Sequence, residues 1–324
     1  MSFPRKRKSI LLHCAYMLNP AYVGMMDLIP RTIMKILITG SNGQVGSSLV
    51  KQLNQMPEIE FLAVDRQQLD ITDCEAVNKL VNELKPNAII NAAAHTAVDR
   101  AEQEVELSYA INRDGPQFLA QAANSVGATI LHISTDYVFA GDKDGEYIET
   151  DTVAPQGVYG QSKLAGELAV TAACPRHIIL RTAWVFYGTG NNFVKTMLRL
   201  AHNRDELGVV ADQFGGPTYA GDIANALIVM AKALQAGNTH YGVYHFAGKP
   251  HVSWHQFARE IFKKANEQNI LNKQMKVNAI TSEQYLTPAK RPANSKLDCL
   301  KIEQSFGIKP SNWQAALNNL SGYV

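Results

Sequence analysis

Tyr159 and Lys163 are the side chains whose spacing most clearly points to chemistry. Residues four apart on a helix share one face, with Cβ atoms about 5–6 Å apart. A free tyrosine has a pKa of about 10, and a nearby ammonium lowers that pKa because it stabilises the phenolate. We therefore expect Tyr159 to act as a general acid, with Lys163 as its partner. The alternative is an ordinary helix with a half-buried tyrosine and a solvated lysine.

A glycine-rich turn indicates what this acid would work with. The apolar run 35–39 leads into the sequence GSNGQVG at positions 40–46, and we expect a helix to follow. Glycines let the backbone approach a pyrophosphate, and a helix N-terminus offers free N–H groups to an anion. A tight turn without a ligand would give the same glycines. We predict a dinucleotide site and hydride transfer to a carbonyl, with Lys163 also on the nicotinamide ribose; the predicted turn residues are Gly40, Gly43, Gln44, Val45 and Gly46.

Asp65 and Arg66 bear on which dinucleotide is bound. Asp65 ends the second strand-like run, near the offset of roughly 20 residues at which an acid meets the adenosine ribose. A carboxylate there favours NADH and repels the 2′-phosphate of NADPH, whereas Arg66 could attract that phosphate. The sequence therefore leaves NADPH and NADH both open. Asp70 and Ile71 are predicted beside the adenine, although an acid at a helix start is more often an N-cap.

Two further strand ends carry small or polar residues. Ala94, His95 and Thr96 follow an apolar run, and we expect them to lie under the cofactor, although a loop histidine can simply be held by backbone. Thr135 ends another run, and its hydroxyl could donate to a substrate carbonyl. Asp136 comes next, and it could accept a substrate hydroxyl or cap a turn.

The order of the predicted elements favours a Rossmann-like doubly wound α/β fold. Apolar runs at 61–64, 88–90, 129–133 and 177–180 alternate with helical patterns such as 75–84 and 117–125. This alternation predicts a parallel sheet covered on both faces, with ligands beyond the carboxyl ends of its strands. After residue 185 the pattern loosens. We expect a dinucleotide-binding domain over 34–185 and a smaller α/β substrate-binding lobe over 186–324, with some segments returning to the first domain.

Composition narrows the function classes. Among 324 residues, 19% are charged and the formal net charge is +2, which indicates neither a nucleic-acid nor a membrane surface. The four cysteines are scattered, so we expect neither a disulfide framework nor a zinc site, and the reducing cytoplasm fits. Residues 1–33 carry no periodic pattern and too short an apolar run for a secretory signal. We expect them to be a disordered extension or the product of a start assigned too early, with Met34 as the working start.

Seven segments together resemble the extended short-chain dehydrogenase/reductase family. They are GQVG at 43–46, NAAAHTAVD at 91–99, STDYVF at 134–139, VYGQSKLAGE at 158–167, RTAWV at 181–185, NNF at 191–193 and RPANS at 291–295. The resemblance implies a reductase that transfers a hydride from NAD(P)H to a keto group of a nucleotide sugar. It implies Tyr159 as proton donor, Lys163 as its partner and Thr135 as the group that polarises the carbonyl. The substrate contacts that it implies are Thr135, Asp136, Trp184, Asn192 and Arg291.

The resemblance also bears on metals and assembly. Some relatives hold magnesium between subunits through glutamates, one of them just past the third glycine. Ser47 and Ser48 stand there in this sequence, which argues against a metal-bridged dimer. We predict no metal site, and a homodimer stays open.

Two other functions fit parts of the same pattern. One is another sugar-nucleotide reductase, epimerase or dehydratase of the superfamily. Dehydratase-like members carry an Asp-Glu pair after the threonine, whereas Tyr137 follows Asp136 here. The other is a non-enzymatic regulatory subunit that resembles the beta subunit of methionine adenosyltransferase. Because Thr135, Tyr159 and Lys163 are all present, the sequence favours an enzyme.

Overall fold

The computed structural model describes residues 33–323. The predictions made for residues 1–33 fall outside the described residues, except for Ile33 itself. Met34–Val324 form one compact unit. The division of this unit into two domains near residue 185 stays a prediction.

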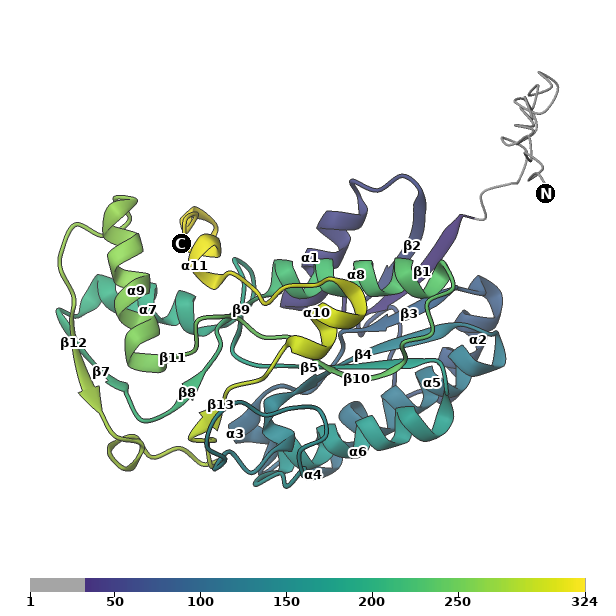
Figure 1. Ribbon diagram of the computed structural model, residues 1–324, viewed down its shortest axis with the longest axis horizontal. Coiled ribbons are helices and arrows are strands. Elements are labelled where there is room, and N and C mark those ends of the chain that lie inside the picture. Colours follow the sequence, from purple (N-terminus) through teal and green to yellow (C-terminus); the bar gives the residue numbers. More distant parts are fainter. Residues whose placement is uncertain (1–32, 324) are drawn as a thin grey trace, which may run out of the picture. The chain divides into compact units, whose positions relative to one another are not determined.

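A six-stranded sheet forms the centre of the unit (Figure 1). Its order is β10-β5-β4-β3-β1-β2, and every adjacent pair is parallel. The strands are β1 (Met34–Thr39), β2 (Ile59–Val64), β3 (Ala88–Asn91), β4 (Thr129–Thr135), β5 (His177–Thr182) and β10 (Gly242–His245). Strand β10 lies beyond residue 185, where the dinucleotide-binding domain was predicted to end. The predicted doubly wound parallel sheet is confirmed.

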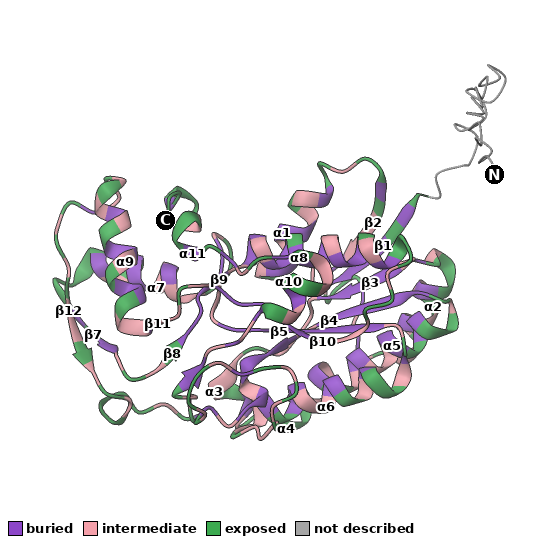
Figure 2. Cartoon of the chain, in the orientation of Figure 1, coloured by how far each residue is buried: buried purple, intermediate pink, exposed green. Residues whose placement is uncertain are grey.

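Helices cover both faces of this sheet. On one face lie α1 (Gln44–Leu53) and α8 (Ala220–Gln235), and on the other lie α2 (Cys74–Leu84), α5 (Gly115–Ser125) and α6 (Val158–Ala173) (Figure 1). Every residue of β3 and of β5 is buried, as Figure 2 shows for the sheet centre. Such continuous apolar strands are expected where helices cover both faces.

The strand order reverses between β1 and β3, because β2 lies on one side of β1 and β3 on the other. Loops leaving the sheet at a reversal diverge and leave a crevice at the carboxyl ends of the strands. Short helical segments follow β3: α3 (Val98–Ala101), α4 (Val105–Tyr109) and the π-helical turn η2 (Ala110–Asp114). A 3₁₀ turn, η3 (Asp136–Val138), follows β4 directly.

A smaller α/β lobe has its own hydrophobic cluster. Helices α7 (Phe193–Asn203), α9 (Trp254–Glu267) and α11 (Trp313–Ala316) supply most of this cluster. Strand β7 (Glu206–Val210) pairs in parallel with β12 (Lys276–Ile280). A small sheet has the order β11 (Val252–Ser253), β8 (Phe214–Gly215) and β13 (Asn294–Ser295), and β6 (Val185–Phe186) pairs with β9 (Thr218–Tyr219). The remaining elements are η4 (Ser282–Gln284), α10 (Leu300–Phe306) and η5 (Ser321–Tyr323).

Local capping explains where three helices begin. Asn192 caps α7, Ser253 caps α9 through a reciprocal contact with Gln256, and Asp73 caps α2. Each side-chain oxygen accepts a backbone N–H that would otherwise lack a partner. The N-cap alternative for Asp70 is therefore wrong. Its Oδ1 accepts from the backbone N and the Oγ1 of Thr72 instead, at 3.0 and 2.7 Å.

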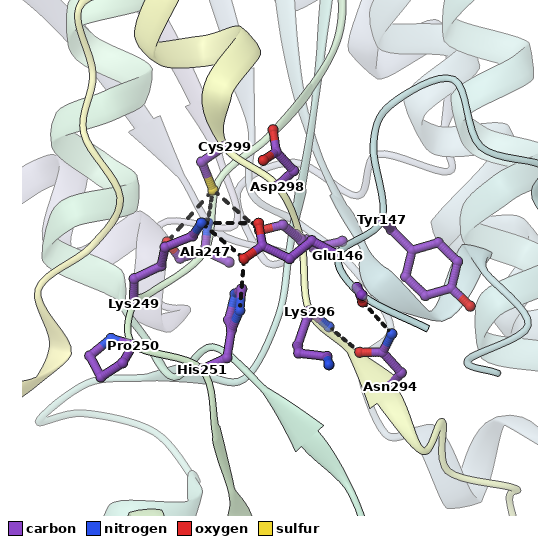
Figure 3. A network of polar contacts seen from close by, with 12 residues as sticks. Glu146, Tyr147, Ala247, Lys249, Pro250, His251, Asn294, Lys296, Asp298 and Cys299 are labelled. Atoms are coloured by element: carbon purple, nitrogen blue, oxygen red, sulfur yellow. Dashed lines mark hydrogen bonds and ion pairs between the residues drawn. The ribbon is translucent and has the colours of Figure 1, made fainter. Parts of the chain in front are cut away.

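A polar network ties three distant segments together (Figure 3). Lys249 Nζ lies 3.0 Å from both carboxylate oxygens of Glu146, and His251 Nδ1 lies 3.3 Å from Glu146 Oε1. Asn294 Nδ2 donates to the carbonyls of Lys143 and Gly145 at 2.6 and 2.7 Å. These contacts hold the segment around β13 against the loop after η3. Arg291 lies just before this segment in the chain.

The described residues carry neither a membrane-spanning helix nor a cluster of metal-ligating side chains. No helix within residues 33–323 is long and apolar enough to cross a membrane. Within the same part of the chain, no group of three or more His, Cys, Asp or Glu side chains is placed to hold a metal ion.

Candidate functional site

A cleft of about 810 Å³ lies at the reversal point of the sheet. Three successive strand ends line it. The segment after β1 contributes Gly40, Asn42 and Gly43, the segment after β2 contributes residues from Asp65 to Ile71, and the segment after β3 contributes residues 92–95. Ile111 completes the lining. The structure therefore brings together these predicted cofactor-binding residues: Gly40, Gly43, Asp65, Asp70, Ile71, Ala94 and His95.

The glycines act through close backbone packing. Gly40 has a φ of +73°, and a Cβ there would lie 2.6 Å from the backbone nitrogen of Ala93. A Cβ on Gly46 would lie 2.1 Å from the carbonyl oxygen of Gly40. None of the described side chains caps the N-terminus of α1, which begins right after Gly43. The turn thus presents uncapped backbone N–H groups to the cleft, which suits a pyrophosphate.

Six of the residues predicted to bind the cofactor do not line the cleft, and two of them, Tyr159 and Lys163, lie on α6. Val45 is 8% exposed and packs in the core, and Gly46 serves the turn. Gln44 Oε1 accepts from Asn192 Nδ2 at 3.0 Å, so it joins the turn to the start of α7. Thr96 is exposed and lies outside the residues that line the cleft.

Asp65 is held in a fixed orientation at the end of β2. Its Oδ1 accepts the backbone N–H groups of Gln67 and Gln68 at 2.9 and 3.1 Å, and its Oδ2 accepts from Asn42 Nδ2 at 2.8 Å. Asn42 was not predicted as a site residue, although its place between Gly40 and Gly43 was a usable signal. Arg66 is largely exposed, and its Nε lies 3.7 Å from Asp70 Oδ2. The basic group that could meet a 2′-phosphate therefore already faces an acid.

His95 is anchored by more than backbone. Its backbone N donates to Asn112 Oδ1 at 2.8 Å, its Nδ1 lies 3.0 Å from Ser108 Oγ, and its Nε2 lies 3.0 Å from Glu104 Oε2. Asn112 also donates to Ser162 Oγ on α6 at 3.1 Å. This asparagine, in the π-helical turn, links the cofactor cleft to α6. π-Helical turns occur often at functional sites, but no spacing in the sequence marked this one.

Lys163 lies inside the protein, so the alternative of a solvated lysine is wrong. It is 2% exposed, and its Nζ donates to the carbonyl of Ile133 at 2.6 Å and lies 3.3 Å from His132 Nε2. Burial lowers the pKa of Lys163 to about 8, against a smaller opposing effect of Glu167. Burial disfavours the charged form of a lysine.

The pKa of Tyr159 departs from our expectation. Burial raises it above the ordinary value, and the Thr135 hydroxyl opposes this only in part. The expected lowering by Lys163 was wrong for this state, because the lysine Nζ donates to Ile133 on β4 instead. Tyr159 therefore carries its proton near neutral pH, as a proton donor must. The ring of Tyr159 lies edge-on to that of Tyr137, with centroids 5.4 Å apart.

Thr135 and Asp136 form a buried pair at the end of β4. Thr135 Oγ1 donates to Asp136 Oδ1 at 3.0 Å and accepts the backbone N–H of Tyr137 at 3.2 Å. Burial raises the pKa of Asp136 to about 6, although the polar groups of Ser295 and Thr135 nearby oppose the shift. Among the described residues, Asp136 Oδ2 has no hydrogen-bond partner. A buried acceptor without a partner suits a hydroxyl of a bound substrate.

A buried ion pair fixes α6 against the sheet. Arg181 on β5 donates to both oxygens of Glu167 at 2.9 and 2.6 Å, and Ser134 Oγ donates to Glu167 Oε1 at 2.5 Å. Glu167 follows Lys163 by one helical turn. Bidentate pairs of this kind set geometry precisely, so they fix the helix that carries Tyr159 relative to Thr135.

A second cleft, of about 870 Å³, opens towards the smaller lobe. Trp184, Asn192 and Arg291, all predicted substrate contacts, line it together with Tyr137 and Ser295. Thr135 and Asp136 do not line it and lie buried at the end of β4. Much of the remaining lining is apolar or aromatic, as is common in small-molecule sites.

Trp184 is placed by an unusual backbone and a close stack. Its φ of +51° is rare for a residue other than glycine. Its ring stacks on Trp254 of α9, with centroids 3.5 Å apart, and a Cβ on Gly215 would lie 2.6 Å from it. Trp254 was not identified from the sequence, because it lies 70 residues away and only the fold brings it here.

Asn192 and Arg291, the other two predicted substrate contacts in this cleft, are hydrogen-bonded to other residues of the protein. Asn192 Oδ1 caps α7, and its Nδ2 donates to Gln44 and to the carbonyl of Tyr187 at 2.6 Å. Arg291 donates to Asp99 Oδ2 at 2.6 Å. Asp99, which lies in the NAAAHTAVD segment, orients the guanidinium at the edge of the cleft.

The two clefts meet the same helix. Asn112 connects α6 to His95 of the first cleft, and Tyr137 connects Tyr159 to the second. A doubly wound sheet with a dinucleotide-type cleft at its reversal point and a tyrosine–lysine pair beside it defines a Rossmann-type oxidoreductase.

Comparison with known proteins identifies the family. Residues 34–322 match the family described as RmlD substrate binding domain. A dTDP-4-dehydrorhamnose reductase from Aggregatibacter actinomycetemcomitans is 55% identical over 291 residues, which cover 90% of this chain and 99% of that protein. The chain belongs to the family of dTDP-4-dehydrorhamnose reductases.

Solved structures agree. A dTDP-4-dehydrorhamnose reductase from Clostridium acetobutylicum superposes with a TM-score of 0.81 at 47% identity, covering 88% of this chain and 97% of that one. The enzyme from Bacillus anthracis, solved in complex with NADP, gives a TM-score of 0.81 at 38% identity over the same shares.

Proposed function

We infer that the protein reduces the 4-keto group of dTDP-4-dehydro-6-deoxy-L-mannose to give dTDP-L-rhamnose, with NADPH or NADH as hydride donor. The observation that carries this proposal is the position of α6. Its tyrosine and lysine lie where the cofactor-type cleft and the aromatic cleft approach one helix. The names and high identities of the relatives support the same reaction.

Tyr159 is proposed to donate the proton. Its raised pKa keeps the phenol protonated until an alkoxide begins to form. Thr135 is proposed to turn its hydroxyl from Asp136 Oδ1, the acceptor that it meets in this structure, to the carbonyl oxygen of the substrate. Lys163 would bind the nicotinamide ribose of a bound cofactor, and it can return a proton to the tyrosine because its pKa of about 8 allows exchange near neutral pH.

The residues present fit a nicotinamide dinucleotide. The uncapped start of α1 would take the pyrophosphate, Asp65 the adenosine ribose, and residues 92–95 the underside of the cofactor. When bound, the cofactor supplies the hydride. The protein's own contribution is to hold the carbonyl between Thr135 and Tyr159.

The substrate residues are proposed from the second cleft. Trp184 on its Trp254 support offers a flat apolar face to the sugar ring. Asp136 lies outside the lining of this cleft, and its Oδ2 is proposed as an acceptor for a hydroxyl of a sugar that reaches the end of β4. Arg291, which also lines this cleft, offers a cation that is paired with Asp99. We keep the homodimer and the cytoplasmic location as predictions, to be tested by sedimentation and by cell fractionation.

One assay tests the function. Freshly generated dTDP-4-keto-6-deoxy sugar is mixed with the purified protein and NADPH or NADH, and cofactor oxidation is followed together with the product's NMR spectrum. We expect stoichiometric formation of dTDP-L-rhamnose. Conversion to a different epimer at carbon 4 would favour another sugar-nucleotide reductase. No oxidation with either cofactor, together with capture of a partner protein, would favour the regulatory-subunit alternative.

A further inference from the structure

A buried hydrogen-bond chain crosses the sheet and ends at Lys163. Thr39 Oγ1 on β1 donates to Asn91 Oδ1 on β3 at 2.7 Å. Asn91 Nδ2 lies 2.9 Å from His132 Nδ1 on β4, and His132 Nε2 lies 3.3 Å from Lys163 Nζ on α6. The four residues are between 0% and 2% exposed. A chain this dry has to satisfy every donor and acceptor from within the protein.

The backbone fixes the direction of the asparagine amide. Asn91 Oδ1 accepts the backbone N–H of Ala93 at 3.1 Å. A backbone N–H can only donate, so the oxygen must lie on that side and the NH₂ group must face His132. His132 Nδ1 therefore accepts a hydrogen bond and carries no proton. A neutral imidazole in this position carries its proton on Nε2.

This tautomer has a consequence for the lysine. The Nε2–H of His132 points at Lys163 Nζ. A neutral amine has a lone pair that accepts this hydrogen, whereas an ammonium has three donors and no acceptor. Two donors would then face each other in a dry site.

We propose that Asn91 and His132 form a positioning chain that presents an imidazole Nε2–H to Lys163, and that this contact favours the neutral amine over the ammonium. The proposal rests on the function proposed for the Tyr159 and Lys163 pair. It assigns to His132 and Asn91 a part in setting the proton affinity of that pair. Neither residue lines either of the two clefts.

The other ionisable groups around Lys163 do not cancel the effect of His132 on the protonation state of the lysine. Glu167, on the same helix, favours the ammonium, but Arg181 on β5 and Ser134 on β4 already occupy its carboxylate. Tyr159 lies one helical turn earlier and is neutral. Burial holds the pKa of His132 well below its usual range, so the imidazole stays neutral.

The tautomer can be measured directly in the intact protein. Nitrogen-15 NMR of labelled imidazoles distinguishes Nδ1–H from Nε2–H, and the His132 signals are assigned by their loss in His132→Asn. We expect neutral Nε2–H across the range in which the protein is folded. A neutral Nδ1–H form, or an imidazolium near neutral pH, would overturn the proposal whatever the variants do.

Two variants test the effect on Lys163. In His132→Asn, the amide oxygen can still accept from Asn91, but the donor facing the lysine is gone. In Asn91→Asp, a carboxylate would draw the proton to Nδ1 and leave Nε2 as an acceptor. Since one buried hydrogen bond is worth about 1 kcal/mol, we expect each variant to raise the pKa of Lys163 by about one unit.

The readouts separate this role from a structural one. The lysine pKa is followed by carbon-13 NMR of labelled lysine side chains, with the Lys163 signal assigned by its loss in Lys163→Met. The matching limb of the kcat/KM pH profile should move by the same amount. His177→Asn, which changes another buried histidine, on β5, is the control and should move neither. An unchanged lysine pKa in folded His132→Asn contradicts the proposal, whereas an inactive wild-type protein would contradict the proposed function instead.

Discussion

The cofactor cleft and the substrate cleft are built in different ways. The first is lined by loops that follow β1, β2 and β3, together with Ile111, so its residues all fall between positions 40 and 111. The second is lined by residues from 98 to 295, drawn from both halves of the chain. Both have similar volumes, about 810 and 870 Å³. The two clefts therefore differ in which parts of the chain line them rather than in size.

The chemistry of each cleft follows from its assembly. The first relies on backbone groups at a glycine turn, which the local sequence dictates. The second relies on side chains such as Trp184 and Trp254, which meet only after the lobe has folded. A change in one cleft should therefore leave ligand binding in the other intact, and the predictions below test this separation.

The largest effect is expected between the clefts. Tyr159→Phe keeps the ring contact with Tyr137 but removes the proton donor, so kcat should fall roughly 10²–10⁴-fold. The affinities for both ligands should stay unchanged, as measured by calorimetry. Tyr244→Phe, a change to a buried tyrosine on β10, serves as the control. Near-normal turnover of Tyr159→Phe would remove the residue from the mechanism.

Asp136 predicts a pH dependence of stability. Its folded pKa of about 6 lies above the ordinary 3.8, so the folded state holds this proton more tightly than the unfolded state does. The group therefore penalises folding above pH 6, and the penalty disappears as the pH falls to about 4. Two units correspond to roughly 3 kcal/mol. Asp136→Asn should be more stable than the wild type by about that amount near pH 8.

Urea unfolding of both proteins at a series of pH values measures this difference. The advantage of the Asp136→Asn variant should shrink as the pH falls. A difference that stays constant with pH would show that the carboxyl does not titrate in this range.

Trp254→Leu should affect the substrate cleft alone. The change removes the ring that stacks on Trp184. Because an aromatic pair contributes about 0.5–1.5 kcal/mol, KM for the keto sugar should rise up to about tenfold. The dissociation constant of NADPH, measured by fluorescence titration, should not move. Weaker cofactor binding would mean that the two clefts are coupled.

Arg66→Ala should affect the cofactor cleft alone, by the smallest amount. Arg66 is exposed and shares its charge with Asp70 at 3.7 Å, so its contact with a 2′-phosphate is worth about 1 kcal/mol at most. We expect the ratio of kcat/KM for NADPH to that for NADH to fall by a factor of about five or less. Lys51→Ala, an exposed basic residue on α1, is the control. An unchanged ratio would mean that Arg66 does not read the 2′ position.

The polar network of Figure 3 illustrates why sequence patterns predicted only some of the contacts around the second cleft. The motif RPANS marked Arg291, but the same motif also carries Asn294, whose side chain donates to the carbonyls of Lys143 and Gly145. Those contacts join residues about 150 positions apart. No periodicity or spacing in the chain encodes such a pairing.

Local patterns in the chain were enough to predict the parallel sheet, the glycine turn and the tyrosine–lysine pair. Each depends on local rules: buried strands read as apolar runs, glycine permits close approach, and residues four apart share a helix face. Only the tertiary structure decided the state of the pair. Burial raises the pKa of Tyr159 and lowers that of Lys163. The packing of α6 on β4 places His132 beside the lysine. Desolvation and the direction of a hydrogen bond depend on everything that surrounds a group, and that is known only once the chain has packed.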